Sequence, residues 1–396
     1  MTTKRKDNRG RILQIGESQR KDGRYAYKYL NNHGEAKFIY SWRLNPTDPL
    51  PSGKRTCVSL RELEQDLQKD RLDGIDSSGK KMTVCQLYEK QNNLKPNVRT
   101  ATVNGRNQLM KLLQEDKLGN MQIASVKPSD CKEWALRMNK KGYAYQTVNN
   151  YKRSLKGAFY MAVTDDLVRK NPFNWSLSDV LKDDTVHKEA LSKEQVEKLL
   201  TFVKNDEVYQ RHYNAIVVLL NTGLRISELC GLTDNDIDFE NNYISVNHQL
   251  LKDKSGYHIS EPKTESGIRK IPMLDVTRKA LQEQMNSRTG IKKITVDGYS
   301  DFIFNTANGY PAYGNVYAVA FSGLIKKHNK MYKDDTLPSI TPHVLRHTFC
   351  TNMAFAKMNP KNLQYILGHK HISITLDYYT HASYETAMEE MMSLTA

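Results

Sequence analysis

The sequence predicts a multidomain protein that is mainly α-helical and carries small β elements. Its 396 residues exceed the roughly 100–200 residues of an ordinary domain. Apolar and polar residues alternate early in the chain, whereas helical spacing begins near residue 82. Positive charge is uneven, because the first 186 residues hold +14 of the net charge of +15. These observations predict three domains, over residues 1–75, 80–180 and 187–396.

The composition excludes several classes of protein. No stretch approaches the roughly 18 apolar residues that a membrane helix needs, and the first residues lack the apolar core of a secretion signal. We therefore expect no membrane contact and no secretion. The five cysteines are odd in number and widely spaced, which favours a reducing compartment. The excess of positive charge makes a polyanion the first partner to consider.

Three short β-rich segments open the chain, over residues 11–18, 24–31 and 36–43. The segments between them carry Asp-Gly and His-Gly pairs, which are typical of tight turns. In the second segment, a period of two puts Arg24 and Lys28 on one face and three tyrosines on the other. The pattern therefore predicts a small antiparallel sheet.

A helix is predicted after this sheet, running to about Leu72. Ser59 and Glu62 have the spacing of a capping box, which marks the start of a helix. A sheet face can enter the major groove of DNA, but solvated charges on an autonomous module explain the pattern equally well. The candidate DNA contacts are Arg20, Arg24, Lys28, Tyr40 and Lys54.

Four helices are predicted after the linker of residues 73–81. Apolar residues recur at helical spacing over residues 82–94, 99–116, 128–140 and 144–164. Residues 81–186 carry 18 basic and 10 acidic side chains, an excess that favours contact with a DNA backbone. Pro, Asn, Asp and Ser crowd residues 171–195, which we interpret as an interdomain linker, with a new helix beginning at Ser192.

Residues 187–396 have nearly balanced charge, so their function needs a different signal. They are predicted to be helical around a β-hairpin of residues 242–252 and 256–262. Lys263 follows the second strand on a turn, where a lysine is ordinarily solvated. Arg225 follows a helix break and is predicted to lie one residue into a new helix, where backbone N–H groups and the helix dipole suit an oxyanion.

A helix start is also predicted at Thr341 and Pro342. His343 and Arg346 then share one helix face. This places an imidazole, which can carry a proton, beside a guanidinium, which can donate two hydrogen bonds to an oxyanion. His343 and His347 also have the spacing of a zinc helix. The glutamate of that motif is missing and no cluster of further ligands follows, so we expect no metal site.

A last group of polar residues follows Gly368, which is predicted to end a helix. His369 comes next, and a second short helix ends in Tyr378 and Tyr379. Paired tyrosines at a helix end usually serve packing. Each candidate residue has such an ordinary explanation, and only their joint order in one chain argues for chemistry.

That order resembles the signature of the tyrosine recombinase (phage-type integrase) family, which is Arg, Lys, His-x-x-Arg, His and Tyr. The matching segments are TGLRISEL, PKTESGIRKIP, TPHVLRHTF and LGHKHISITLDYYTH. The resemblance covers the full length and is strongest to the integrases of Gram-positive conjugative tetracycline-resistance transposons. It implies an arm-type DNA-binding domain, a helical core-binding domain and an α+β catalytic domain.

The resemblance also implies a mechanism without a cofactor or metal. Tyr379, favoured over Tyr378 by its Tyr-Thr-His context, would attack a DNA phosphate to form a 3′-phosphotyrosyl bond. Arg225 and Arg346 would meet the charge on the phosphate oxygens. The implied catalytic residues are Arg225, Lys263, His343, Arg346, His369 and Tyr379.

The remaining catalytic roles are implied in the same way. Lys263 would protonate the departing 5′-oxygen. His343 would handle the tyrosine proton, and His369 would hydrogen-bond the phosphate or orient the nucleophile.

The implied assembly is a homotetramer that exchanges strands of two duplexes through a Holliday junction, with an accessory excisionase or DNA-bending protein. Arm-type and core-type sites would be the two DNA partners, and the bacterial cytoplasm, at the nucleoid, the place of action. The methionine-rich tail of residues 383–396 fits a helix that docks on a neighbouring subunit, or equally on its own domain. A type IB topoisomerase and a non-catalytic DNA-binding regulator are the alternative functions.

Overall fold

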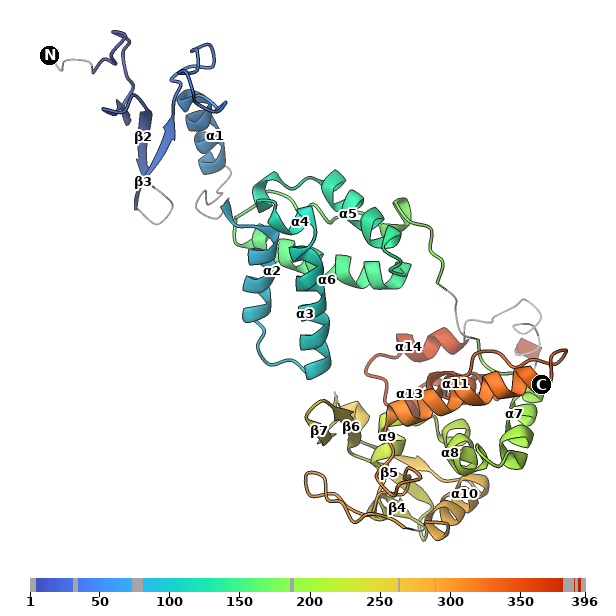
Figure 1. Ribbon diagram of the computed structural model, residues 1–396. Coiled ribbons are helices and arrows are strands. Elements are labelled where there is room, and N and C mark those ends of the chain that lie inside the picture. The colour runs from blue at the N-terminus through green and yellow to red at the C-terminus, as the bar shows by residue number, and fades with distance from the viewer. Residues whose placement is uncertain are drawn as a thin grey trace. The chain divides into compact units, whose positions relative to one another are not determined.

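The chain forms two compact units, residues 1–186 and 187–396, in a computed structural model (Figure 1). The structure describes residues 5–30, 35–72, 81–185, 189–262, 264–288, 290–379, 388, 391 and 392. Within these ranges, no helix is long and apolar enough to cross a membrane. The predicted class, mainly α with small β elements, is confirmed.

The first unit begins with a three-stranded antiparallel sheet and one helix. Its elements are β1 (Glu17–Gln19), β2 (Tyr25–Leu30), β3 (Ala36–Ser41) and α1 (Leu60–Leu72), with strand order β1-β2-β3. Tyr27 pairs with Ile39, and both pack against a small core that includes Tyr25 and Leu60. The predicted capping box is confirmed, because the backbone N–H of Ser59 donates to Glu62 at 3.0 Å.

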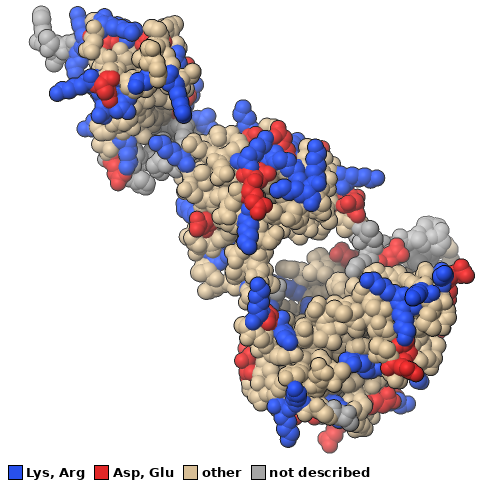
Figure 2. Space-filling view, viewed as in Figure 1, with Lys and Arg blue, Asp and Glu red and all other residues tan. Residues whose placement is uncertain are grey.

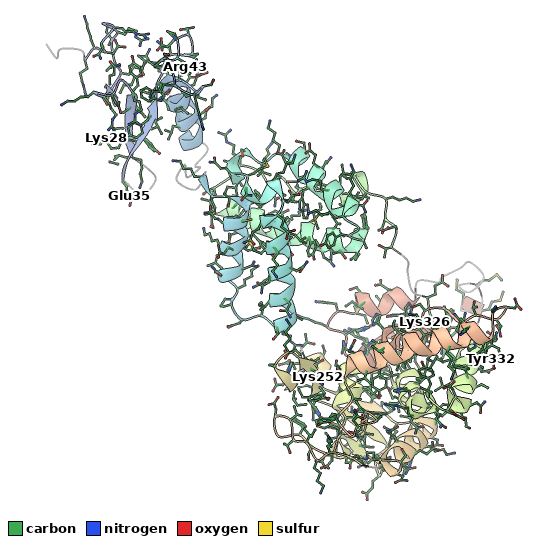
Figure 3. All side chains as sticks on the ribbon, in the orientation of Figure 1. Lys28, Glu35, Arg43, Lys252, Lys326 and Tyr332 are labelled. Carbon is green, nitrogen blue, oxygen red and sulfur yellow. The ribbon has the colours of Figure 1, made fainter. Side chains whose placement is uncertain are left out.

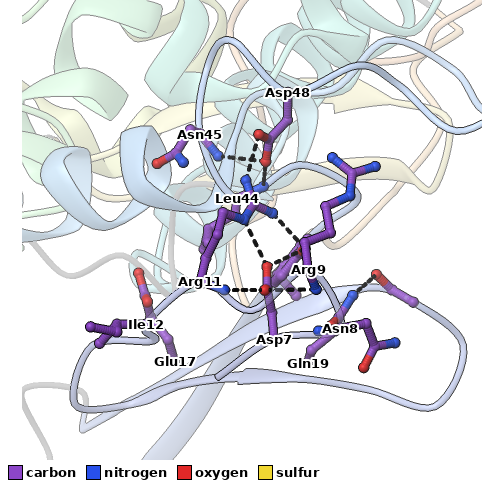
Figure 4. Close-up of polar contacts among 12 residues, drawn as sticks. Asp7, Asn8, Arg9, Arg11, Ile12, Glu17, Gln19, Leu44, Asn45 and Asp48 are labelled. Carbon is purple, nitrogen blue, oxygen red and sulfur yellow. Dashed lines mark hydrogen bonds and ion pairs between the residues drawn. The ribbon is translucent and has the colours of Figure 1, made fainter. Parts of the chain in front are cut away.

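The first predicted strand, residues 11–18, is wrong in its bounds. Only residues 17–19 pair in the sheet, because polar contacts fold the preceding segment into a loop. Asp7 accepts from the backbone N–H and the side chain of Arg11, both at 2.8 Å. Arg11 also reaches Asp48 at 2.6 Å, which ties this loop to the segment before α1 (Figure 4).

The rest of the first unit is helical, as predicted. Its helices are α2 (Val84–Asn93), α3 (Thr100–Gln114), α4 (Lys117–Asn120), α5 (Pro128–Lys140) and α6 (Tyr145–Thr164). Trp134 and Phe159 are completely buried in its core. Phe173 and Leu177 are buried in the same core, so the predicted linker is wrong in its first part. That segment completes the helical fold because its apolar side chains fill the core between the helices.

The second unit surrounds a large core with helices. They are α7 (Lys193–Asn205), α8 (Tyr213–Thr222), α9 (Ile226–Gly231), α10 (Asp275–Asn286), α11 (Gly314–Met331), α12 (Pro342–Phe355), α13 (Pro360–Leu367) and α14 (Ser373–Leu376). Ser192 caps α7 and Thr341 caps α12, with Pro342 at its first turn, as predicted. A single 3₁₀ turn, Asp377–Tyr379, follows α14.

Two small antiparallel sheets replace the one predicted hairpin. The first contains β4 (Ile237–Asp238), β5 (Tyr243–Val246) and β8 (Arg269–Pro272); the second contains β6 (Gln249–Asp253) and β7 (Gly256–Ser260). The predicted strand of residues 242–252 is therefore two strands in different sheets. His248 lies at the break, where its ring is buried and contacts the Gly231 carbonyl oxygen at 2.7 Å.

Candidate active site

A sharp reversal of the chain at Gly223, between α8 and α9, positions Arg225 at the start of α9. Gly223 ends α8 with φ of +64°, and a Cβ atom there would lie 2.5 Å from the Phe349 ring. Glycine is therefore required both by the backbone and by the close approach. Arg225 is the N-cap residue of α9 rather than its first helical residue, which corrects the sequence prediction by one position.

Glu228 holds Arg225 from within the same helix. The backbone N–H of Arg225 donates to Glu228 Oε2 at 2.9 Å, and its guanidinium Nη1 donates to Oε1 at 2.7 Å. Arg225 Nη2 contacts the Gly368 carbonyl oxygen at 3.3 Å. The Arg225 side chain remains 41% exposed, so its guanidinium is accessible to a ligand from solvent.

Arg346 is buried beside Arg225, with only 4% of its surface exposed. Its Nη1 donates to the Gly223 carbonyl at 2.6 Å, and its Nη2 donates to the Leu367 carbonyl at 2.7 Å. Burial, and then the charge of Arg225, lowers the Arg346 pKa to about 10. The group stays cationic at neutral pH, and a further anion would relieve the repulsion between the two arginines.

His369 contacts Arg346 directly. Its Nε2 lies 3.1 Å from Arg346 Nη2, and its Nδ1 lies 3.0 Å from the Thr375 hydroxyl. Because a guanidinium only donates, Nε2 must accept and the imidazole proton must be on Nδ1. Burial, followed by the charges of Arg346 and other nearby groups, lowers the His369 pKa to about 4. His369 is therefore neutral at physiological pH.

Three arginine side chains bind carbonyl groups at the last turn of α13. Its successive carbonyl groups at Ile366, Leu367 and Gly368 accept from Arg269, Arg346 and Arg225, respectively. Such carbonyl groups lack partners within the helix and form its negative dipole end. The helix terminus therefore attracts all three guanidinium groups to one place.

Glu228 and Arg269 are functional candidates that the sequence interpretation missed. Glu228 is buried and contacts Arg269 Nη2 at 2.9 Å. Burial alone would raise the pKa of Glu228, but its contacts with Arg269 and Arg225 hold that pKa below its ordinary value. The spacing of Arg225 and Glu228 was a usable signal, since residues three apart meet on a helix. No local pattern signals Arg269.

The two histidines of the rejected zinc motif have different surroundings. His343 is exposed on α12, and its electrostatic interaction with His369 contributes to the lowered pKa of His369. His347 is half-buried, contacts the Thr351 hydroxyl at 3.1 Å and packs edge-on against the Tyr378 ring. Over the ranges that the structure describes, no three His, Cys, Asp or Glu residues are grouped as metal ligands would be.

The two adjacent tyrosines are also different. Tyr379 donates its hydroxyl hydrogen to the Met358 carbonyl at 2.6 Å, and burial raises its pKa. Tyr378 packs against His347, and burial, followed by the influence of Cys350, raises its pKa to about 12. Both rings contact the small core of Phe349 and its neighbours. Two predicted features lie outside the described residues: Lys263, and the tail of residues 383–396 except at 388, 391 and 392.

Five residues of the first unit are the candidate DNA contacts. They are Arg20, Arg24, Lys28, Tyr40 and Lys54, and Lys28 is labelled in Figure 3. Arg20 and Arg24 lie 5.2 and 5.6 Å from the centre of the Tyr40 ring. Lys54 lies 4.6 Å from the centre of the Trp42 ring. Figure 2 shows Lys and Arg side chains standing out from this module.

Family models match both ends of the chain. The phage integrase family matches residues 189–386, which include the arginine cluster and Tyr379. The DNA-binding domain of Tn916 integrase matches residues 1–71, which include the sheet and α1.

Individual relatives are similar over much greater lengths. The transposase from transposon Tn916 of Enterococcus faecalis is 57% identical over 395 residues, which cover 100% of this chain and 97% of the relative. A Tn1549 transposon integrase structure is 54% identical with a TM-score of 0.77, covering 79% of this chain and 99% of that one. A second Tn1549 structure has a TM-score of 0.76. This chain therefore belongs to the phage integrase family and is a tyrosine-type site-specific DNA recombinase.

Proposed function

We propose that this recombinase cuts and rejoins the DNA ends of a mobile element, with Tyr379 as its nucleophile. The observation that carries this proposal is the convergence of Arg225, Arg346 and His369 at the last turn of α13. The two arginines offer positive charge and N–H donors to one phosphate group, and His369 contacts Arg346. The arrangement suits transfer of a phosphodiester between a tyrosine and a DNA hydroxyl.

The proposed reaction exchanges one ester bond for another. The Tyr379 oxygen forms a bond to phosphorus, the bond from phosphorus to the 5′-oxygen breaks, and a 3′-phosphotyrosyl ester results. His343 takes the tyrosine proton and Lys263 supplies a proton to the departing 5′-oxygen. Because the new ester retains the energy of the old one, attack by a 5′-hydroxyl reseals the strand without ATP.

The arginines have the main electrostatic role in this proposal. Arg225 and Arg346 donate to the two non-bridging oxygens, where negative charge grows in the transition state. A preorganised donor of this kind contributes about 3–4 kcal/mol. His369 orients Arg346 through the 3.1 Å contact and, being neutral, adds no repulsion to the pair.

Tyr379 must change partner before it attacks. Its hydroxyl hydrogen is engaged by the Met358 carbonyl, a group in the segment between α12 and α13. The hydroxyl therefore has to leave Met358 to reach a phosphate held by the arginines. DNA binding is the step that we propose draws it away.

The names of the solved relatives support the choice of substrate. Tn1549 integrase is described in complex with a circular intermediate DNA and with transposon right end DNA. Those complexes contain substitutions written R225K and Y379F, which have the same residue types and numbers as Arg225 and Tyr379 here. We infer that element ends and their circular joint are the substrates of this chain as well.

The sheet of the first unit supplies a second DNA contact in this proposal. Arg24 and Lys28 are placed to reach base edges or phosphates, and Arg20 and Lys54 to reach phosphates. Stacking of Arg20 and Arg24 near Tyr40 limits their rotation before DNA arrives. The division of the first unit into an arm-type domain, residues 1–75, and a core-binding domain, residues 80–180, is part of the same proposal.

The proposed assembly is a homotetramer on two duplexes that passes through a Holliday junction. An accessory excisionase or DNA-bending protein completes it, because sites held by two linked modules must be brought together on bent DNA. We expect the reaction to take place in the bacterial cytoplasm, at the nucleoid, where DNA is found.

A suicide duplex, nicked so that the cut fragment diffuses away, tests the chemistry. We expect the full chain to form a covalent complex whose labelled peptide contains phosphorylated Tyr379. Absence of that complex on element-end DNA would contradict the proposal. On two intact sites, formation of a four-way junction would distinguish a recombinase from a topoisomerase.

A further inference from the structure

We propose that Arg269 is a positioning residue that sets the geometry of the phosphate-binding arginines without touching DNA. The inference rests on the proposed roles of Arg225 and Arg346. It starts from the third guanidinium of the cluster, which the reaction described above does not use. Arg269 is the first residue of β8, and its side chain is 0% exposed.

The contacts of Arg269 leave little capacity for a phosphate. Its Nε donates to the Ile366 carbonyl at 2.6 Å, and Nη1 donates to the Gly267 carbonyl at 3.0 Å. Nη1 and Nη2 also reach the two oxygens of Glu228, at 3.2 and 2.9 Å. Four of five N–H groups are thus occupied inside the protein, so Arg269 acts through its neighbours.

The first neighbour is Glu228, which Arg269 and Arg225 share. Oε1 accepts from both guanidinium groups, and Oε2 accepts from Arg269 and from the backbone N–H of Arg225. Arg269 therefore fixes the plane of the carboxylate that aims Arg225. Without Arg269, the Glu228 carboxylate is free to turn toward Arg225 and to accept hydrogen bonds from both of its terminal guanidinium nitrogens. Arg225 would then be less available to a phosphate.

The second neighbour is the last turn of α13. Arg269 binds the Ile366 carbonyl, directly before the carbonyl groups that hold Arg346 and Arg225. A Cβ atom on Gly368 would lie 3.2 Å from Arg269 Nη1, so the turn and this guanidinium pack closely. One side chain thus links β8, α9 and α13 at the point where the phosphate is proposed to bind.

Lysine cannot reproduce this link. Its ammonium is a single point charge, whereas the guanidinium is a planar fork that reaches a carboxylate and carbonyl groups in fixed directions. Arg269→Lys keeps the charge and loses the geometry. We expect single-turnover cleavage of a suicide duplex to fall about tenfold to a hundredfold, while the Kd for that duplex changes less than about twofold.

Arg288→Lys is the matched control. Arg288 lies in the same unit, has a mostly buried side chain, and binds Asp234 at 2.8 Å and the Met285 carbonyl at 3.2 Å. Among the residues that the structure describes, the partners of Arg288 are Met285, Asp301, Phe302 and Asp234, none of which belongs to the arginine cluster. We expect its cleavage rate to remain within about twofold of wild type. An equal loss in both lysine variants would overturn the proposal, because general weakening of the unit would then explain it.

A duplex with a methylphosphonate at the scissile position gives a readout that a structural role would not affect. The methyl group replaces a charged oxygen, so the arginines have less charge to meet. We expect the ratio of wild-type to Arg269→Lys rates to be several times smaller on this duplex than on the ordinary one. An unchanged ratio would overturn the proposal.

A second variant covers the case in which Arg269→Lys does not fold. Arg269→Gln combined with Glu228→Gln removes both buried charges together, which proteins tolerate better than one unpaired charge. We expect the double variant to bind the duplex and to cleave at least tenfold more slowly; wild-type cleavage in that variant would contradict the inference. If the wild-type protein does not cleave the duplex, the proposed function fails. If the wild-type protein cleaves it and the Arg269 variants cleave it at the same rate, this inference alone fails.

Discussion

The exposed basic face of the N-terminal sheet and the buried arginine cluster of the second unit place guanidinium groups in opposite surroundings. Arg24 lies at the surface beside Tyr40 and pairs with Asp22 at 2.7 Å. Arg346 is enclosed and held by two backbone carbonyl groups. Burial lowers the pKa of Arg346, whereas the hydrogen bonds that Arg24 donates to the Asp22 carboxylate raise the pKa of Arg24.

The two surroundings give the two sites different properties. Exposed charges are screened by salt and contribute separately, so they supply affinity and dependence on ionic strength. Buried guanidinium groups interact strongly, keep fixed directions and depend on one another. The predictions below test this contrast, from the largest expected effect to the smallest.

Replacement of the nucleophile should abolish DNA cleavage by the second unit and leave DNA binding by the first unit unaffected. We expect Tyr379→Phe to abolish covalent complex formation with no change in DNA affinity. Tyr378→Phe should retain covalent complex formation, because that ring packs against His347. Sequencing of the trapped peptide checks the assignment, and a label on Tyr378 would reverse it.

Removal of a buried guanidinium should slow cleavage strongly. We expect Arg346→Ala to reduce single-turnover cleavage by about 10²–10³, since its donors meet the phosphate charge. Raising the salt concentration should leave the ratio of the wild-type to the Arg346→Ala cleavage rate nearly constant, because buried charges are poorly screened. A loss that follows the salt dependence of DNA binding would show that Arg346 acts like a surface charge.

Removal of an exposed guanidinium should weaken binding alone. We expect Arg24→Ala to cost about 1–3 kcal/mol in arm-type DNA affinity and to leave cleavage of a short core-site duplex nearly intact. Deletion of residues 1–75 provides the stronger form of the test. If that deletion abolished cleavage of the short duplex, the separation of the two regions would be wrong.

Stability should depend on pH through His369, which is neutral in the folded state. Its folded pKa is about 4 against an ordinary value of 6.5, so between these values the unfolded chain binds the extra proton. Stability therefore falls as the pH drops through this window, by up to about 1.4 kcal/mol per pH unit. Denaturant titrations of His369→Gln should show a shallower decline; an equal slope would contradict the neutral assignment.

The smallest expected effect is that of a chelator. Cleavage should persist in excess EDTA, because guanidinium groups meet the phosphate charge in this site. Loss of activity that a divalent ion restores would instead support the His343 and His347 metal interpretation.

Features that depend on contacts between neighbouring residues could be predicted from the amino-acid sequence. The capping residues Ser59, Ser192 and Thr341 and the helices of residues 84–164 follow from local signals, and the structure places them within a few residues of the predicted bounds. The same signals misplaced the first strand and the hairpin, because Arg11 and His248 interrupt these segments through contacts with the distant residues Asp48 and Gly231.

The contacts that hold the site together join residues far apart in the sequence, so they became visible in the tertiary structure alone. Arg269 meets Glu228 across 41 positions and Ile366 across 97, and Arg346 reaches Gly223 across 123. Periodicity and capping extend over a few residues, so they carry no information about such partners. A buried charge, in contrast, must find its counter-charge and acceptors wherever the folded chain supplies them. For this reason the order of the signature residues was visible in the sequence, while the distant partners of Arg269 and Arg346 were not.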